Sequence, residues 1–178
     1  MMYRDMDQQI ENFFARNPRE ALMITGARQV GKTFSIRNYA RKHFQHVIEV
    51  NFIENPQAIT LFENAQSSDD ILLRLSALTD VPMKKSETLI FFDEVQECRE
   101  IVTAVKFLVD DGSYRYILSG SLLGVELKNI RSIPVGYMTV FEMFPLNFME
   151  FCRANRISDQ VLTHLQNCFE KKESVDPM

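Results

Sequence analysis

The stretch that decides the fold is Ala21-Leu22-Met23-Ile24-Thr25-Gly26-Ala27-Arg28-Gln29-Val30-Gly31-Lys32-Thr33. It joins a short apolar run to the pattern of glycine, four residues, glycine, lysine and serine or threonine. This is the phosphate-binding loop pattern, in which a strand leads into a glycine-rich turn and the turn opens a helix. Backbone N–H groups and the helix N-terminus then face a nucleoside polyphosphate. The stretch therefore predicts a nucleotide-binding loop.

The chemistry of phosphate binding explains the glycines, the lysine and the threonine of this loop. Gly26 and Gly31 have no Cβ, so the backbone can come close to an anion. Lys32 would reach the β- and γ-phosphates as a compact cation, and the Thr33 hydroxyl would ligate Mg²⁺. The residues expected to bind the nucleotide are Gly26, Ala27, Arg28, Gln29, Val30, Gly31, Lys32 and Thr33.

A second motif is the run Thr88-Leu89-Ile90-Phe91-Phe92-Asp93-Glu94-Val95. Its apolar part predicts a buried parallel strand that carries two acids at its C-terminal end. In open α/β sheets, ligands bind at that edge. We expect Asp93 to hold the Mg²⁺ that bridges the phosphates, and Glu94 to orient and deprotonate an attacking water.

A third segment, Tyr116-Ile117-Leu118, runs into Ser119-Gly120-Ser121. Taken locally, this pattern is typical of a serine-glycine turn after a strand. A small polar residue at the end of a strand beside the acidic strand could also hydrogen-bond the γ-phosphate or the attacking water. Both interpretations stay open on local grounds.

Helix and strand patterns alternate along the chain, which predicts a mostly parallel sheet with helices on both faces. Helical spacing of apolar residues begins at Met6, and the helix after the phosphate loop offers Phe34, Ile36, Tyr39 and Ala40 for its buried face. We expect further helices over 71–78 and 101–109. The expected strands cover 21–25, 46–52, the acidic run, 114–118 and 137–141. The predicted fold class is an α/β P-loop NTPase three-layer sandwich with a sheet of about five strands.

Composition favours a single cytoplasmic domain. The chain has 178 residues, 46% hydrophobic residues and a net charge of −4. None of its apolar runs approaches the roughly 18 residues that a membrane helix needs, and we expect no membrane partner. Three widely spaced cysteines and three isolated histidines predict reduced thiols and no zinc site. The net charge argues against a nucleic-acid surface over the whole domain but leaves a local patch open.

The order of these pieces resembles that of prokaryotic AAA-type ATPases whose ATPase core is followed by a second domain of unknown function. That group has an extra strand between the phosphate loop and the acidic strand. The resemblance covers roughly residues 20–152. The residues that carry it are the phosphate loop, Leu89-Ile90-Phe91-Phe92-Asp93-Glu94-Val95-Gln96, Leu118-Ser119-Gly120-Ser121 and Phe144-Pro145-Leu146-Asn147-Phe148-Met149-Glu150-Phe151.

The resemblance implies an Mg²⁺-dependent ATPase with ATP as its nucleotide. It implies the phosphate-loop roles for Lys32 and Thr33, the magnesium role for Asp93 and the water-activating role for Glu94. Ser119 and Ser121 are both candidates for the γ-phosphate sensor. Arg131 lies in the interval where such ATPases carry an arginine that reaches a neighbouring subunit's nucleotide, and an exposed loop arginine is the equal alternative. A homo-oligomer is therefore an expectation.

The expected organisation has three parts: an N-terminal amphipathic helix over 1–20, the ATPase core over 20–152, and a helical or frayed segment over 153–178. Two interpretations of this segment stay open: the chain is a fragment of a longer protein, in which the segment begins a lid that a further C-terminal domain follows, or it is a truncated relative. In both cases the ATPase is expected to be slow without the lid. Two alternatives remain: a small-molecule phosphoryl transferase and a non-hydrolysing nucleotide switch in a larger regulator. A GTPase is disfavoured, because the sequence has no Asn-Lys-x-Asp segment after a strand.

Overall fold

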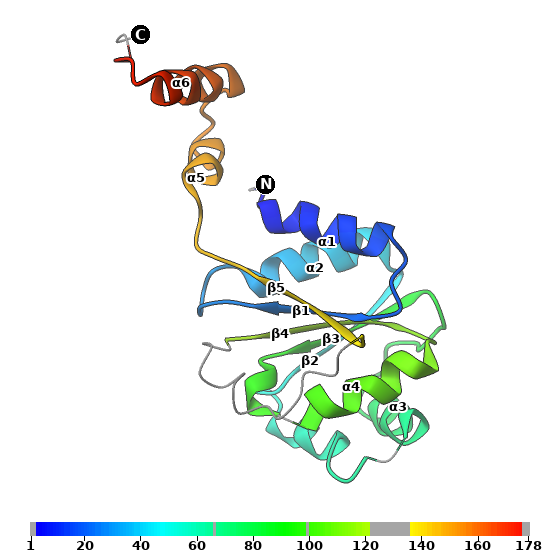
Figure 1. The fold of residues 1–178 in the computed structure, drawn as a ribbon. Coiled ribbons are helices and arrows are strands. Elements are labelled where there is room, and N and C mark those ends of the chain that lie inside the picture. The colour runs from blue at the N-terminus through cyan, green and yellow to red at the C-terminus, as the bar shows by residue number, and fades with distance from the viewer. Residues whose placement is uncertain (1–2, 66, 99, 122–135, 176–178) are drawn as a thin grey trace.

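The computed structural model describes residues 3–65, 67–98, 100–121 and 136–175, and a central sheet organises them (Figure 1). The sheet has five strands in the order β2-β3-β4-β1-β5, and the pairings between neighbouring strands are parallel. The strands are β1 (Ala21–Thr25), β2 (His46–Asn51), β3 (Thr88–Asp93), β4 (Arg115–Gly120) and β5 (Met138–Glu142). Strand β4 therefore lies between the phosphate-loop strand and the acidic strand, as predicted.

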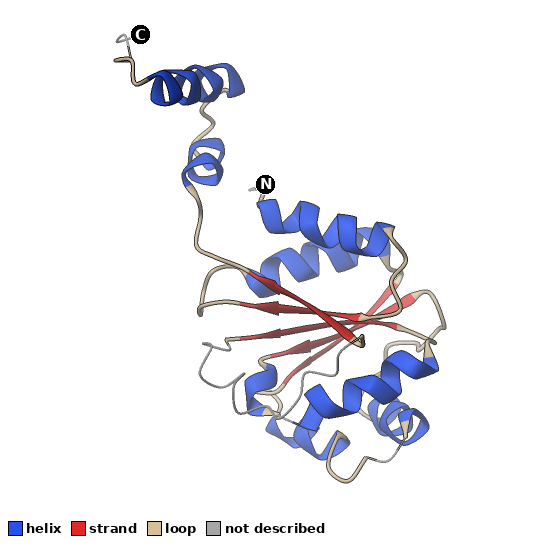
Figure 2. Cartoon of the chain, in the orientation of Figure 1, coloured by secondary structure: helices blue, strands red, loops and turns tan. Residues whose placement is uncertain are grey.

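Helices cover both faces of this sheet (Figures 1 and 2). On one face lie α1 (Asp5–Ala15) and α2 (Lys32–His43); on the other lie α3 (Ser68–Ala77) and α4 (Glu100–Asp111). Two short 3-10 helices, η1 (Pro56–Leu61) and η2 (Val95–Glu97), follow β2 and β3. The predicted three-layer α/β sandwich is confirmed.

After β5 the chain leaves the sheet. It forms α5 (Phe148–Ala154) near the N-terminal end of α1 and then α6 (Asp159–Lys171), which lies farther from the sheet (Figure 1). Among the described residues, none of the helices is long and apolar enough to cross a membrane.

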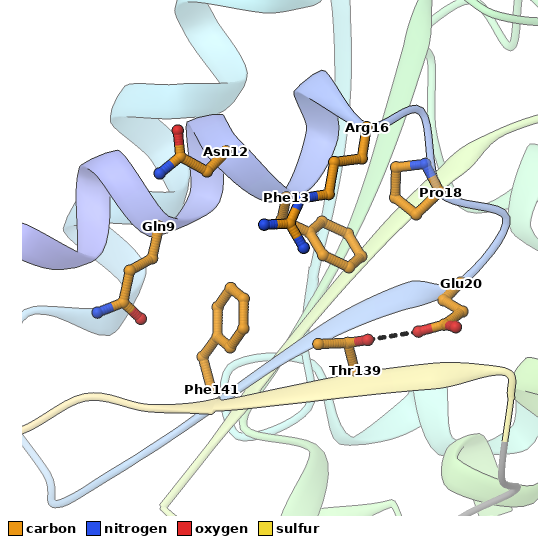
Figure 3. Close-up of a pocket in the computed structure, with 8 residues that line it drawn as sticks. All are labelled: Gln9, Asn12, Phe13, Arg16, Pro18, Glu20, Thr139 and Phe141. Atoms are coloured by element: carbon orange, nitrogen blue, oxygen red, sulfur yellow. Dashed lines mark hydrogen bonds between the residues drawn. The ribbon is translucent and has the colours of Figure 1, made fainter.

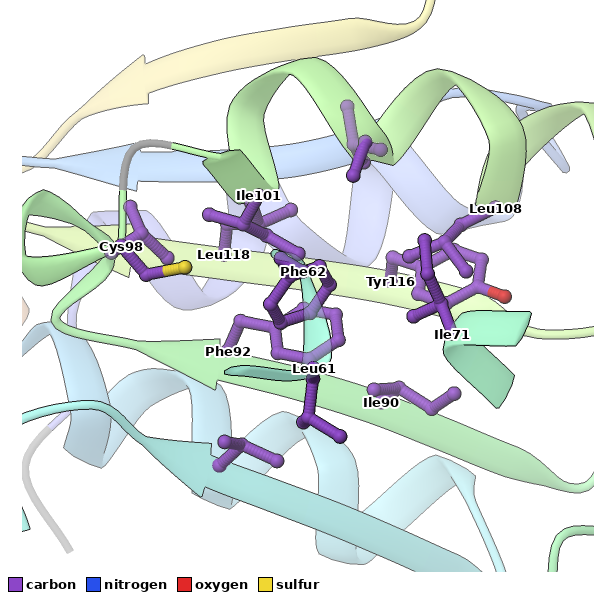
Figure 4. Packing of buried hydrophobic residues seen from close by; sticks show 14 of the residues in the cluster. Leu61, Phe62, Ile71, Ile90, Phe92, Cys98, Ile101, Leu108, Tyr116 and Leu118 are labelled. Atoms are coloured by element: carbon purple, nitrogen blue, oxygen red, sulfur yellow. The ribbon is translucent and has the colours of Figure 1, made fainter. Parts of the chain in front are cut away.

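The core divides into two layers because each buried strand presents alternate side chains to opposite faces. In β3, Ile90 and Phe92 pack with α3 and α4 (Figure 4), whereas Leu89 and Phe91 pack with α1 and α2. All six positions of β3 are buried. This burial on both faces explains the continuous apolar run in the sequence.

One expectation about α2 is wrong. Phe34 was expected on the buried face of the helix, but 51% of its surface is exposed. The buried positions Ile36, Tyr39 and Ala40 lie on one face, at i, i+3 and i+4. Phe34 precedes Ile36 by two residues, and a separation of two places it on the opposite side of a helix.

Candidate nucleotide-binding site

The phosphate loop connects β1 to α2, and its glycines are required by the surrounding backbone. Gly26 has φ +142°, and a Cβ there would lie 2.1 Å from the Met143 carbonyl oxygen. Gly31, the residue before α2, has φ +102°, and its Cβ would lie 3.3 Å from Arg4 Nη1. An L side chain would be strained at both positions. The loop pattern therefore reflects close packing against Arg4 and Met143 as well as access for an anion.

Lys32 lies at the first position of α2 and is 6% exposed. Its Nζ donates to the carbonyl oxygens of Gly26 at 2.9 Å and Ala27 at 2.8 Å, so the ammonium lies within the curve of the loop. Burial lowers the pKa of Lys32, the carboxylates of Glu94 and Asp93 oppose that shift, and Arg28 adds to it. The loop and the two acids thus share one electrostatic environment.

Thr33 and Asp93, the two predicted magnesium ligands, are in direct contact. Thr33 Oγ1 donates to Asp93 Oδ2 at 3.0 Å, and Asn51 Nδ2 donates to the same oxygen at 3.3 Å. Asp93 is 2% exposed. Parallel pairing explains the arrangement, because β1, β2 and β3 all end at the same edge of the sheet. Asn51 has no part in the sequence-based prediction, although its position at the end of β2 could have indicated it.

The oxygen atoms of Thr33 and Asp93 are of the kind that Mg²⁺ prefers. Among the described residues, no group of three or more His, Cys, Asp or Glu side chains could hold a metal ion by itself. Mg²⁺ typically uses one or two protein oxygens together with substrate phosphates and water. The donor set therefore fits a magnesium ion that arrives with its nucleotide.

Glu94 follows directly after β3 with φ 58°, a left-handed conformation that is uncommon for a non-glycine residue. Its Oε2 accepts a hydrogen bond from Gln96 Nε2 at 2.6 Å. Gln96 Oε1 accepts in turn from the backbone N–H of Ser121 at 3.1 Å. Gln96 therefore bridges the acidic strand and the end of β4. The sequence-based reasoning missed this role, although Gln96 ends the quoted motif.

The two candidate sensor serines differ in their surroundings. Ser119 is fully buried, and its Oγ donates to Asp93 Oδ1. Ser121 is half-buried, and its backbone N–H contacts Gln96. The structure thus brings the Ser119 hydroxyl to the acidic strand, while the sensor role of either serine stays a prediction. Arg131 lies outside the described residues.

The motif that begins at Phe144 has a structural role that the sequence did not indicate. Its Glu150 accepts a hydrogen bond from Arg4 Nε at 3.0 Å, and Arg4 Nη1 donates to the carbonyl oxygen of Val30 in the phosphate loop at 2.6 Å. Burial by itself raises the pKa of Glu150. The N–H groups of Asn147 and Asp5, together with Arg4, outweigh burial and lower that pKa overall.

An open cavity of about 680 Å³ lies beside the phosphate loop. Its lining comes from Arg4, the loop, the first turn of α2 and the segment after β5. The lining residues are Arg4, Arg28, Gln29, Val30, Gly31, Phe34, Pro145 and Leu146. The exposed Phe34 ring therefore lies at the wall of this cavity. A second cavity, of about 440 Å³, lies between α1 and the edge strand β5 and has no lining residue from the loop (Figure 3).

The sheet order, the phosphate loop and the acidic strand that meets it define a P-loop nucleoside-triphosphatase domain. Comparison with known families agrees with this class. A model described as an AAA domain matches residues 18–152, and the chain belongs to that family. Membership of this family supports ATP binding and ATPase activity in general terms.

The chain is also similar to a curated protein whose function is uncharacterized. An uncharacterized protein of Methanocaldococcus jannaschii is 30% identical over 137 residues, which are 76% of this chain and 29% of the relative. The chain thus spans under a third of the length of that relative.

Among solved structures, the Pif1 helicase from Candida albicans aligns with a TM-score of 0.51 at 10% identity. The alignment covers 94% of this chain and 44% of the helicase, and the likeness concerns the fold. A second Pif1 helicase structure, described as unwinding forked double-stranded DNA, aligns with a TM-score of 0.47 at 14% identity. That alignment covers 83% of this chain and 45% of that chain.

Proposed function

We propose that this domain binds ATP with Mg²⁺ and hydrolyses it. The observation that carries the proposal is the 3.0 Å hydrogen bond from Thr33 Oγ1 to Asp93 Oδ2. It joins the phosphate loop to the acidic strand, 60 residues farther along the chain. A loop that matched the pattern by chance would not meet a buried carboxylate at the edge of the sheet where ligands bind.

Each residue of the site then has a role in binding or hydrolysing ATP. Lys32 leaves the loop carbonyls and donates to the β- and γ-phosphates, while loop N–H groups hold the remaining phosphate oxygens. Thr33 and Asp93 supply oxygen ligands for Mg²⁺, which neutralises charge on the phosphates when it is bound. Glu94 accepts the proton of the attacking water, and Ser119 keeps Asp93 oriented.

The cavity beside the loop is the proposed binding site for the nucleoside part of ATP. Phe34, Pro145 and Leu146 provide apolar surface in a cavity that loop residues also line, and Arg28 provides a cation in the same lining. Nucleotide sites commonly combine apolar walls with a small number of polar groups. We therefore place the base and ribose in this cavity.

A non-hydrolysing nucleotide switch is the second candidate. The bond from Gln96 to the Glu94 carboxylate favours it, because that bond occupies an oxygen atom that would otherwise be free to accept the water's proton. In a switch, Glu94 would stay with Gln96 while ATP is bound. In an ATPase, Gln96 would hold Oε2 while the other carboxylate oxygen, Oε1, accepts the water's proton.

Calorimetric titration with ATP and Mg²⁺ tests binding, and analysis of the products tests the reaction. Lys32→Ala should abolish binding, because the phosphate charge is left poorly neutralised. Lys42→Ala, a change in the last turn of the same helix, is the matched control and should bind normally. Wild-type affinity in Lys32→Ala would contradict the assignment of the loop.

Product analysis distinguishes the candidate functions. Release of phosphate from ATP supports the ATPase, and bound ATP without turnover supports the switch. A phosphorylated acceptor would indicate a phosphoryl transferase.

A further inference from the structure

Arg4 and Glu150 form a buried ion pair that the chemistry above does not use. Arg4 Nε lies 3.0 Å from Glu150 Oε1, and the two side chains are 5% and 4% exposed. The residues are 146 positions apart in the sequence. A pair at this depth is stable only when its other donors and acceptors are also satisfied, because the cost of desolvating both charges is large.

The remaining partners of the Arg4 guanidinium are backbone carbonyl groups. Nη1 donates to Val30 at 2.6 Å, and Nη2 donates to Phe144 at 2.8 Å. The guanidinium therefore connects three segments: the start of α1, the phosphate loop and the chain after β5. Arginine suits such a connection because its planar fork presents several donors in fixed directions.

Glu150 holds this guanidinium in place. Its Oε1 also accepts from the N–H of Asp5 at 2.8 Å, and its Oε2 accepts from the N–H of Asn147 at 2.9 Å. In the described part of the chain, the other side-chain hydrogen bonds from the α5 region to α1 come from Asn147 and Arg153, and both go to Asp5. The attachment of α5 to the core is thus concentrated at Arg4 and Asp5.

The bond to Val30 has a consequence for phosphate binding. The Val30 carbonyl belongs to the peptide that it shares with Gly31, and in a planar trans peptide the C=O and N–H groups point in opposite directions. By holding the carbonyl, Arg4 directs the Gly31 N–H away from itself. Gly31 is the residue directly before α2, where loop N–H groups meet an anion.

We propose that Arg4, held by Glu150, is a positioning residue that fixes the Val30–Gly31 peptide in the orientation that binds the triphosphate. The proposal rests on the proposed ATP binding and adds a residue that touches neither phosphate nor metal. Because Glu150 lies on α5, ATP affinity also depends on the placement of α5 against α1. Such coupling is reciprocal, so bound ATP strengthens the attachment of α5.

If the Arg4–Glu150 pair only stabilised the fold, its loss would not change ATP affinity in a folded protein. A double variant distinguishes this structural role from the proposed positioning role. Arg4→Met with Glu150→Gln leaves no buried charge, and the Gln amide oxygen can still accept from the Asp5 N–H. Removing both charges of a buried pair is often neutral for stability. We expect the double variant to fold, as judged by thermal unfolding, and to bind ATP with Mg²⁺ roughly tenfold more weakly, since the Val30 carbonyl has lost a charged donor. Wild-type affinity in the folded double variant would overturn the proposal.

A control comes from a more exposed ion pair elsewhere in the domain, in which the arginine also donates to a backbone carbonyl group. Arg74, on α3, pairs with Asp70 at 2.6 Å and donates to the carbonyl oxygen of Glu63 at 3.0 Å. Helix α3 covers the face of the sheet opposite α1 and α2 (Figure 1). Arg74→Met with Asp70→Asn should leave ATP affinity unchanged. An equal loss of affinity in the control would show that general loosening, and not the loop peptide, explains the effect.

One further measurement does not depend on whether a variant folds. The wild-type chain needs no variant: ATP should slow hydrogen exchange at the Asp5 and Asn147 N–H groups, which donate to Glu150. Unchanged exchange in ATP-bound protein would overturn the coupling. If the wild-type chain itself fails to bind ATP, the proposed function fails; if it binds and the folded double variant binds equally well, the positioning role alone fails.

Discussion

Gln96 Nε2 donates to Glu94 Oε2 at 2.6 Å, and this hydrogen bond fixes the carboxylate that follows the acidic strand. Gln96 is itself held at its other end by the N–H of Ser121. Glu94 has a left-handed backbone conformation, which is strained for a residue with a side chain and is often found at functional sites. The orientation of Glu94 therefore depends on a residue two positions farther along.

Gln96→Ala should lower kcat for ATP by about 10- to 100-fold, because a misplaced catalytic group costs rate in that range. The affinity for ATP should stay unchanged, since Gln96 contacts neither the loop nor the metal ligands. Steady-state kinetics combined with calorimetry measure both quantities. Gln166→Ala is the control, because Gln166 makes a similar bond to Glu170 on α6. A rise in kcat would instead support the switch, with Gln96 restraining the base.

Glu94→Gln should keep ATP and Mg²⁺ bound while hydrolysis slows by roughly 10²- to 10⁴-fold, because an amide cannot accept the water's proton. Asp93→Asn should mainly shift the magnesium titration to higher concentrations, since it removes a charged oxygen beside Thr33. Phosphate release measured across a range of Mg²⁺ concentrations distinguishes the two variants. Equal loss of nucleotide binding in both would show that the division of roles is wrong.

Glu150 makes stability depend on pH in the acid range. Its folded-state pKa is lowered overall, so the unfolded chain binds its proton more readily than the folded chain does. The stabilisation is fully present above the ordinary carboxyl pKa of about 4.3 and is lost as the pH falls through the lowered value. Chemical unfolding between pH 7 and pH 3 should show this loss.

Glu150→Gln serves as the reference for that experiment. It should lower the free energy of unfolding near neutral pH by about 3–5 kcal/mol, because Arg4 is left buried without its counter-charge. Its stability should then fall less steeply with acid than that of the wild-type chain. Parallel pH profiles for the two proteins would assign the acid sensitivity to other groups.

If Arg131 acts on the nucleotide of a neighbouring subunit, the rate of ATP hydrolysis depends on assembly of the subunits. An arginine supplied by a partner can raise the rate of phosphoryl transfer by roughly 10³- to 10⁵-fold. We therefore expect the rate per subunit to increase with protein concentration and to lose that increase in Arg131→Ala. Phosphate release measured over a range of protein concentrations tests this. A rate per subunit that ignores both concentration and Arg131 would mean that the domain acts alone.

Local patterns were enough to predict much of this fold. The loop of residues 26–33, the apolar run before Asp93 and the alternation of helices with strands each depend on a few neighbouring residues. Strand burial, helix periodicity and glycine-rich turns are properties of short segments, so the sequence displays them directly. Parallel pairing then brings the ends of β1 and β3 to one edge, which is why Thr33 and Asp93 could be assigned together.

Contacts between distant segments were decided by the tertiary structure. Nothing near Arg4 indicates that it meets Glu150, because 146 residues separate them and no local period relates them. The bridge from Gln96 to Ser121 depends in the same way on two strands that lie side by side. Phe34 belongs to a helix that the sequence predicted, but the side of the helix that is buried depends on what packs against it. The sequence by itself determined the class of fold and the chemistry of the loop, whereas the tertiary structure decided which side chains hold that loop and its acids in position.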